Sequence, residues 1–180
     1  MADQVQGLLS PWLRKHRILA ASPYIRGRVL DFGCGVGALS ELCTAADYHG
    51  VDRDEESVII ARSKYPESTF DTRLSPDVTY DTIVMLAVIE HLQNPKETLS
   101  DFRTMLADGG RIVVTTPHPR VDRIHHIGSK IGLFSCDANE EHECLYSLEG
   151  MKDLAESAGL GVIAHKRFLL GVNQLFVLAC

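Results

Sequence analysis

The chain has 180 residues, of which 45% are hydrophobic and 23% are charged, and its formal net charge is −6. This length and composition indicate one soluble globular domain, spanning residues 1–180, with a full hydrophobic core. The negative charge argues against a binder of duplex nucleic acid, which presents a basic face, and no run approaches the roughly 20 apolar residues that span a bilayer.

Apolar residues recur with helical and strand periodicities in alternation along the chain. These patterns predict helices over residues 8–21, 36–46, 55–64, 95–106 and 147–158, and strands over residues 28–32, 48–51, 68–71, 80–86, 111–116, 162–169 and 174–178. Trp12 lies on the apolar stripe of the first helix, and Val58, Ile59 and Ala61 lie on that of the third, so we expect these side chains in the core. The alternation predicts an α/β fold with a doubly wound, mostly parallel seven-stranded sheet and helices on both faces.

The end of the chain departs from this alternation. Only Leu170-Gly171-Val172-Asn173 separates the last two expected strands, so we expect them to pair as an antiparallel hairpin. A parallel sheet that closes with an antiparallel hairpin is unlike a standard dinucleotide-binding domain.

Five cysteines are scattered through the chain, none in a C-x-x-C spacing, and the N-terminus lacks the basic start and apolar core of a signal peptide. This pattern favours unpaired thiols in a reducing compartment, and we expect a cytoplasmic protein. One group of histidines and cysteines could suggest a metal site: His125, His126, Cys136, His142 and Cys144. Their spacing matches no standard zinc pattern, so no metal is expected.

A glycine-rich turn follows the first expected strand. Gly33, Gly35 and Gly37 stand at alternate positions, as a backbone needs that bends sharply and passes close to a ligand. The stretch also satisfies the G-x-G-x-x-G/A pattern of dinucleotide-binding turns, which leaves an NAD-dependent oxidoreductase as an alternative. Asp31 favours a different ligand, because a carboxylate at the strand end suits a cationic ligand better than a pyrophosphate.

With Asp31 included, the turn resembles the first motif of class I S-adenosylmethionine-dependent methyltransferases, which is acidic-x-Gly-x-Gly-x-Gly. Two later stretches fit the same family. Residues 80–92 are similar to the second motif and to its continuation in the ubiquinone-biosynthesis O-methyltransferase family, and residues 105–117 resemble the third motif. The resemblance implies a Rossmann-like methyltransferase fold and S-adenosylmethionine as the cofactor.

The resemblance also implies a set of cofactor-binding residues. In the family, the position of Asp52 accepts hydrogen bonds from the ribose hydroxyls, although an NAD ribose would suit it equally. Asp71 matches the acidic residue that accepts from the adenine amino group, and the backbone amide of Thr72 lies beside it. Leu86 and Ala87 would border the methionine end, whereas Glu90 and His91 are expected to serve the scaffold. The full predicted set is Asp31, Gly33, Cys34, Gly35, Asp52, Arg53, Asp71, Thr72, Leu86 and Ala87.

The connection over residues 117–146 is long for a compact domain and is typical of a lid or substrate segment. It is rich in basic residues, which favours an anionic acceptor, although an amphipathic helix over the sheet would also fit. His118 and His142 are the candidate general bases, because histidine titrates near neutral pH.

These observations predict a monomeric or homodimeric enzyme that transfers a methyl group from S-adenosylmethionine to an oxygen or nitrogen of a small-molecule acceptor. No nucleic-acid partner and no membrane insertion are expected. Besides the oxidoreductase, one further alternative stays open, which is a catalytically inactive methyltransferase-like binding module.

Overall fold

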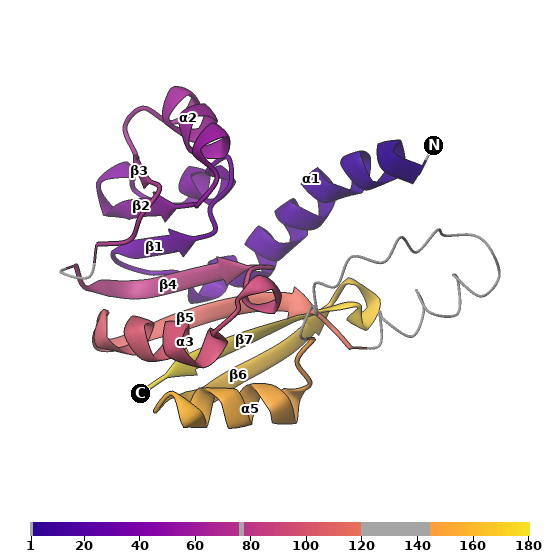
Figure 1. The fold of residues 1–180 in the computed structure, drawn as a ribbon, viewed down its shortest axis with the longest axis vertical. Coiled ribbons are helices and arrows are strands. Elements are labelled where there is room, and N and C mark those ends of the chain that lie inside the picture. Colours follow the sequence, from indigo (N-terminus) through magenta and orange to yellow (C-terminus); the bar gives the residue numbers. More distant parts are fainter. Residues whose placement is uncertain (1, 76–77, 120–144) are drawn as a thin grey trace.

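The computed structural model describes residues 2–75, 78–119 and 145–180, with the side chains described from residue 11 onward. These residues form a seven-stranded sheet in the order β3-β2-β1-β4-β5-β7-β6 (Figure 1). The strands are β1 (Val29–Phe32), β2 (Tyr48–Val51), β3 (Thr69–Asp71), β4 (Tyr80–Leu86), β5 (Leu106–Pro117), β6 (Gly161–Phe168) and β7 (Asn173–Ala179). The first five strands run parallel, and β7 pairs antiparallel with both β5 and β6. The predicted fold class and the terminal hairpin are therefore confirmed.

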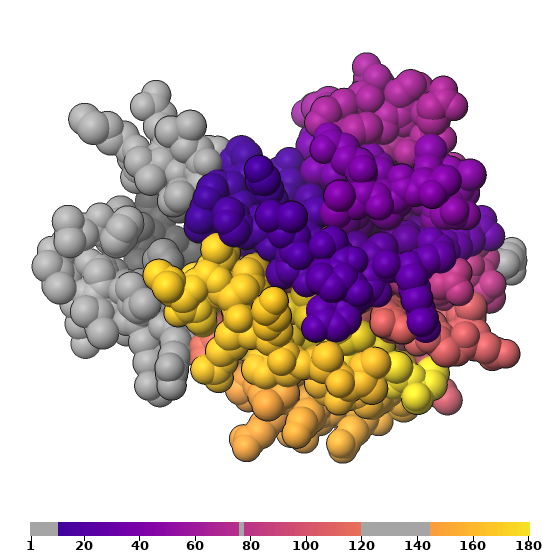
Figure 2. Space-filling model, turned by 180° about the vertical axis from the view of Figure 1, so that it is seen from behind, coloured from indigo at the N-terminus to yellow at the C-terminus, as the bar shows by residue number. Residues whose placement is uncertain are grey.

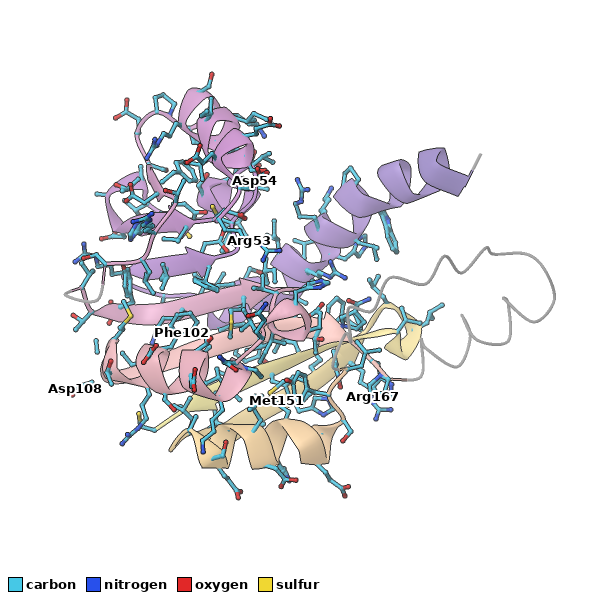
Figure 3. The ribbon with its side chains drawn as sticks, viewed as in Figure 1. Arg53, Asp54, Phe102, Asp108, Met151 and Arg167 are labelled. Atoms are coloured by element: carbon cyan, nitrogen blue, oxygen red, sulfur yellow. The ribbon has the colours of Figure 1, made fainter. Side chains whose placement is uncertain are left out.

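In the part of the chain that the structure describes, four helices cover the two faces of the sheet: α1 (Ala2–Ala21), α2 (Glu55–Lys64), α3 (Pro95–Thr104) and α5 (Leu148–Ser157). On one face, Phe102 of α3 and Met151 of α5 belong to the same buried cluster, and both point from their helices toward the sheet (Figure 3). On the other face, Ala21 of α1 packs in a second cluster with Val58 and Ala61 of α2. No helix in the described part of the chain is long and apolar enough to cross a membrane.

Two helices begin at side chains that cap their first turn. Asp54 accepts a hydrogen bond from the amide of Ser57 at the start of α2, and Ser147 accepts one from the amide of Gly150 at the start of α5. Such caps satisfy amide groups that have no partner inside the helix. Ile59 of α2, expected to face inward, is instead 64% exposed, because the buried stripe of this short helix contains only Val58 and Ala61.

The helix predicted over residues 36–46 does not form. Two 3₁₀ turns, η2 (Ala38–Leu42) and η3 (Ala45–Asp47), take its place. Gly37 precedes η2 in the left-handed region, with φ of 76°, and Cys43 follows it with extended backbone, so no continuous α-helix can run through. The prediction of an α-helix directly after the glycine turn was therefore wrong.

Helix α1 crosses the second face of the sheet and reaches the C-terminal hairpin. In the view from behind, the indigo surface of α1 meets the yellow surface of the hairpin (Figure 2). Arg17 Nε donates a hydrogen bond of 3.2 Å to Asn173 Oδ1, the first residue of β7. Trp12, predicted in the core, is 49% exposed and packs against the ring of His16, so that prediction was wrong.

Candidate functional site

The glycine turn lies directly beyond β1, and all three of its glycines have positive φ: 77° at Gly33, 52° at Gly35 and 76° at Gly37. A Cβ at Gly33 would lie 2.4 Å from Val88 Cγ2, and one at Gly37 would lie 2.6 Å from Phe70 Cε1. Apart from Gly35 and its two chain neighbours, no atom of the described residues lies within 4 Å of the corresponding point at Gly35. Two of the glycines therefore permit close packing, while the third borders open space.

Two pockets open at the carboxyl ends of β1, β2 and β4, where ligands bind in sheets of this type. The larger pocket has a volume of about 410 Å³ and includes Asp52, Arg53 and Thr72 together with the apolar side chains of Phe32, Leu74 and Leu92. The smaller pocket has a volume of about 210 Å³ and includes Asp31, Cys34 and Gly35. Gly33, Leu86 and Ala87 line both pockets, so the two are neighbouring parts of one site.

The structure thus brings together every predicted cofactor residue except Asp71. Asp71 lines neither pocket. Its Oδ2 lies 3.0 Å from His49 Nε2, and its Oδ1 accepts a hydrogen bond of 3.2 Å from Arg62 Nη2. Its neighbour Thr72 reaches the larger pocket instead, and a role for Asp71 in adenine binding stays a prediction.

Asp52 connects β2 to the glycine turn. Its Oδ2 accepts a hydrogen bond of 2.7 Å from the amide of Gly35, and its Oδ1 accepts one of 3.0 Å from the amide of Asp54. Arg53 and Asp54 follow it beyond the end of β2 (Figure 3). Each carboxylate oxygen has more than one lone pair, so both oxygens of Asp52 retain capacity to accept from a ligand in the larger pocket.

Asp31 is a buried carboxyl group, 3% exposed, on the wall of the smaller pocket. Tyr48 donates a hydrogen bond of 2.7 Å from its hydroxyl to Asp31 Oδ2. Burial raises the pKa of Asp31 to about 7, against the lowering effect of the Tyr48 hydroxyl, and the nearby Asp52 carboxylate adds to the rise. Asp31 therefore titrates near neutral pH, and a cation in the smaller pocket would stabilise its ionised form.

The chain bends at the end of β4, where Leu86 and Ala87 line both pockets. Ala87 has φ of 58°, a conformation that residues other than glycine rarely adopt, and its amide donates to the carbonyl of Thr115. Residues held in this region are often found at ligand sites. The bend places Val88 against Gly33, so the turn after β4 and the turn after β1 pack together.

Two arginines that sequence reasoning did not assign to the site also line the smaller pocket. Arg14 and Arg17 project from α1, three residues apart and hence on one side of the helix. Burial lowers the pKa of Arg17, and the charge of Glu90 opposes that change. Their spacing in the sequence does not identify them, because their place in the site depends on how α1 crosses the sheet.

Glu90 is 4% exposed, and burial raises its pKa. This burial agrees with the scaffold role expected for Glu90. His91, expected in the same role, instead lines the larger pocket.

Of the two candidate general bases, His118 lies among the described residues and His142 does not. His118 is buried just beyond β5, where its amide donates to the carbonyl of Val172, and it lines neither pocket. His142 lies outside the described residues, as do residues 120–144 of the expected lid and all five residues of the histidine–cysteine cluster. Among the residues that the structure describes, no group of three or more histidine, cysteine or acidic side chains could hold a metal ion.

Comparisons with known proteins agree with this architecture. Residues 1–165 match the family model described as a methyltransferase domain. The chain is 32% identical over 117 residues to a probable S-adenosylmethionine-dependent methyltransferase of Mycobacterium tuberculosis, a match that covers 59% of this chain and 43% of the relative. It is 31% identical over 102 residues to the ubiquinone biosynthesis O-methyltransferase of Aeromonas salmonicida, covering 49% of this chain and 42% of the relative. The chain thus spans less than half the length of these curated relatives.

A solved structure shares the fold at low sequence identity. The magnesium protoporphyrin IX methyltransferase of Synechocystis, crystallised with bound S-adenosylhomocysteine, superimposes with a TM-score of 0.68 at 18% identity, covering 92% of this chain and 82% of that one. The family resemblance found in the sequence is confirmed, since the matched model covers most of the chain. The chain belongs to the methyltransferase domain family.

Proposed function

We propose that this protein binds S-adenosylmethionine across the two joined pockets and transfers its methyl group to an oxygen or nitrogen of a small-molecule acceptor. The observation that carries the proposal is the placement of two carboxylates. Asp52 lies in the larger pocket and Asp31 in the smaller, with the glycine turn between them. This arrangement matches a ligand that has a hydroxylated ribose at one end and a cationic amino acid at the other.

The larger pocket suits the adenosine half of the cofactor. Asp52 would accept from the ribose hydroxyls, while the apolar side chains of Leu74 and Leu92 offer surfaces for the adenine ring. Thr72 and Arg53 lie at the same pocket and complete its polar wall.

The smaller pocket suits the methionine half. Asp31 would attract the ammonium group, and the guanidinium groups of Arg14 and Arg17 would attract the carboxylate. The open space beside Gly35 leaves room for the ligand chain. Leu86 and Ala87, which line both pockets, would then border the sulfonium centre.

The cofactor supplies an activated methyl group on a sulfonium, which leaves by in-line displacement. The protein's own contribution is to align the acceptor with that methyl group and to exclude water. His118 and His142 remain our candidates for accepting a proton from a hydroxyl or ammonium acceptor. An anionic acceptor, a cytoplasmic location, a single domain over residues 1–180 and a monomeric or homodimeric state belong to the same proposal.

The experiment that tests this proposal is calorimetric titration of the purified protein with S-adenosylmethionine, S-adenosylhomocysteine and NAD. We expect micromolar binding of both adenosyl ligands and no binding of NAD. Binding of NAD alone would instead support the oxidoreductase. Transfer of a radiolabelled methyl group to a panel of acidic hydroxylated and amino compounds then separates an enzyme from an inactive binding module.

A further inference from the structure

Burial and one neighbouring charge oppose the ionisation of Asp31. The Asp52 carboxylate repels its negative charge, and the thiols of Cys34 and Cys43 lie close by. Burial and the charge of Asp31 raise the pKa values of both thiols, so neither carries a charge near neutral pH. Arg14 and Arg17, which line the same pocket from α1, supply the positive charge that faces it.

The Tyr48 hydroxyl is the neutral donor in this environment. Tyr48 is the first residue of β2 and 2% exposed, and its hydroxyl reaches Asp31 Oδ2 at 2.7 Å from the neighbouring strand. Burial and the charge of Asp31 raise the pKa of Tyr48, so the phenol keeps its proton and remains a donor. A hydrogen bond from a neutral donor to a carboxylate stabilises the ionised form.

The position of the Tyr48 ring is fixed by its packing. The ring packs edge-on against Phe70 of β3, with 5.5 Å between the centroids. Phe70 occupies space that a side chain at Gly50 would fill, because a Cβ there would lie 2.6 Å from Phe70 Cδ1. Gly50 pairs with Asp31 across β1 and β2, so the absence of a side chain at Gly50 supports the geometry around the Tyr48–Asp31 contact.

We propose that Tyr48 is a positioning residue that keeps Asp31 ionised and aimed into the smaller pocket, and thereby sets the lower pH limit for binding an ammonium-bearing cofactor. This inference rests on the proposed function, because it assigns the ammonium group of the cofactor to Asp31. Tyr48 itself lines neither pocket and acts through Asp31.

The pH dependence follows from the ionisation of Asp31. A ligand ammonium binds the ionised carboxylate, so affinity is high above the pKa of Asp31, about 7, and falls as the pH drops below it. Loss of the Tyr48 hydroxyl removes the effect that lowers this pKa, so the decline in affinity moves to higher pH. At pH 7 we expect about a fivefold loss of affinity in Tyr48→Phe, because a rise of roughly one pKa unit lowers the ionised fraction of Asp31 from about one half to about one tenth, with recovery toward pH 9.

The test is calorimetric titration with S-adenosylhomocysteine at pH 5.5 to 9, using wild type, Tyr48→Phe and Tyr80→Phe. Tyr80 is an equally buried tyrosine whose hydroxyl lies 2.7 Å from His49 Nδ1 and which lines neither pocket. We expect the wild-type profile from Tyr80→Phe and a shifted profile from Tyr48→Phe. 5′-Methylthioadenosine, which lacks the amino acid group, should bind all three proteins without this pH dependence.

The inference would be overturned if the affinity of Tyr48→Phe varied with pH in the same way as that of wild type, or if the affinity of wild type did not vary with pH. Either result would leave the proposed function intact. Absence of S-adenosylhomocysteine binding by wild type at every pH would instead overturn the proposed function itself. Should Tyr48→Phe fail to fold, Asp31→Asn keeps an acceptor for the tyrosine hydroxyl and carries no titratable group. Its affinity should be low and should not vary between pH 6 and 8, and a wild-type-like profile from this variant would also contradict the inference.

Discussion

The carboxylate of Asp52 accepts a hydrogen bond of 2.7 Å from the amide of Gly35, which fixes the end of β2 against the glycine turn. One side chain thereby joins the two backbone segments that form the wall of the site. The same contact holds the Asp52 oxygens in place before any ligand arrives, which reduces the ordering cost of binding.

Replacing Asp52 should therefore weaken the cofactor site specifically. We expect Asp52→Ala to lower the affinity for S-adenosylhomocysteine by about 10- to 100-fold, because hydrogen bonds to a charged acceptor are lost. Asp54→Ala is the matched control, since it removes a nearby carboxylate that caps α2 and lines neither pocket. It should lower the melting temperature but leave the affinity unchanged in calorimetry, and equal affinity losses in the two variants would contradict the assignment.

The buried carboxyl of Asp31 should make the fold less stable at higher pH. The raised pKa of about 7 means that the folded chain retains this proton while the unfolded chain loses it, so stability falls from about pH 4 to about pH 7. Asp31→Asn removes this dependence and should be more stable than wild type at pH 8, by up to about 4 kcal/mol for a difference of about three pKa units. Thermal melts of both proteins at pH 5 and pH 8 measure this difference in stability. The difference between wild type and Asp31→Asn should be smaller at pH 5 than at pH 8.

Gly35 and Gly171 offer a matched pair for testing the space beside the glycine turn. Both have positive φ, 52° and 86°, and at neither position would an added Cβ have an atom of the described residues, beyond its chain neighbours, within 4 Å. Each change to alanine should cost about 1–2 kcal/mol of stability for backbone reasons, measured by denaturant unfolding. Only Gly35→Ala should also weaken S-adenosylhomocysteine binding, since its methyl group would enter the smaller pocket. Unchanged affinity in this variant would place the ligand elsewhere.

Cys34 should be a slow nucleophile in spite of its place at the site. Burial, together with the charges of Asp31 and Asp52, raises the pKa of its thiol, so little thiolate is present at neutral pH. We expect iodoacetamide at pH 8 to label Cys34 more slowly than the exposed Cys180, with the order read by peptide mass spectrometry. Faster labelling of Cys34 would show that its surroundings are more open or more positive than the structure indicates.

Much of the fold could be predicted because the strands here carry strong local signals. β2, β4 and α2 have the predicted bounds, since apolar runs and flanking turn residues define their ends. The segment after Gly37 could not be predicted as well. Its residues favour a helix, but tertiary packing holds Gly37 beside Phe70 with positive φ and so imposes a 3₁₀ turn.

The candidate site also contains residues that could be predicted from the sequence and residues that could not. Residues fixed by the ends of β1, β2 and β4 lie where spacing predicts, because the carboxyl ends of parallel strands meet at one edge. Asp71 departs from this pattern, since His49 and Arg62 both contact its carboxylate. Arg14 and Arg17 were missed because their contribution depends on how α1 crosses the sheet, a tertiary relationship that their spacing alone does not reveal.

The sharing of Gly33, Leu86 and Ala87 by both pockets has a consequence for inhibitors. Adenosine should bind weakly in the larger pocket and methionine should bind weakly in the smaller one, and both should be able to bind at the same time. In a compound that joins the two fragments by a short linker over Ala87, the second fragment would bind after the first with an effective concentration in the millimolar range. Fragment pairs joined at that point are therefore a rational starting scaffold for selective ligands of this protein.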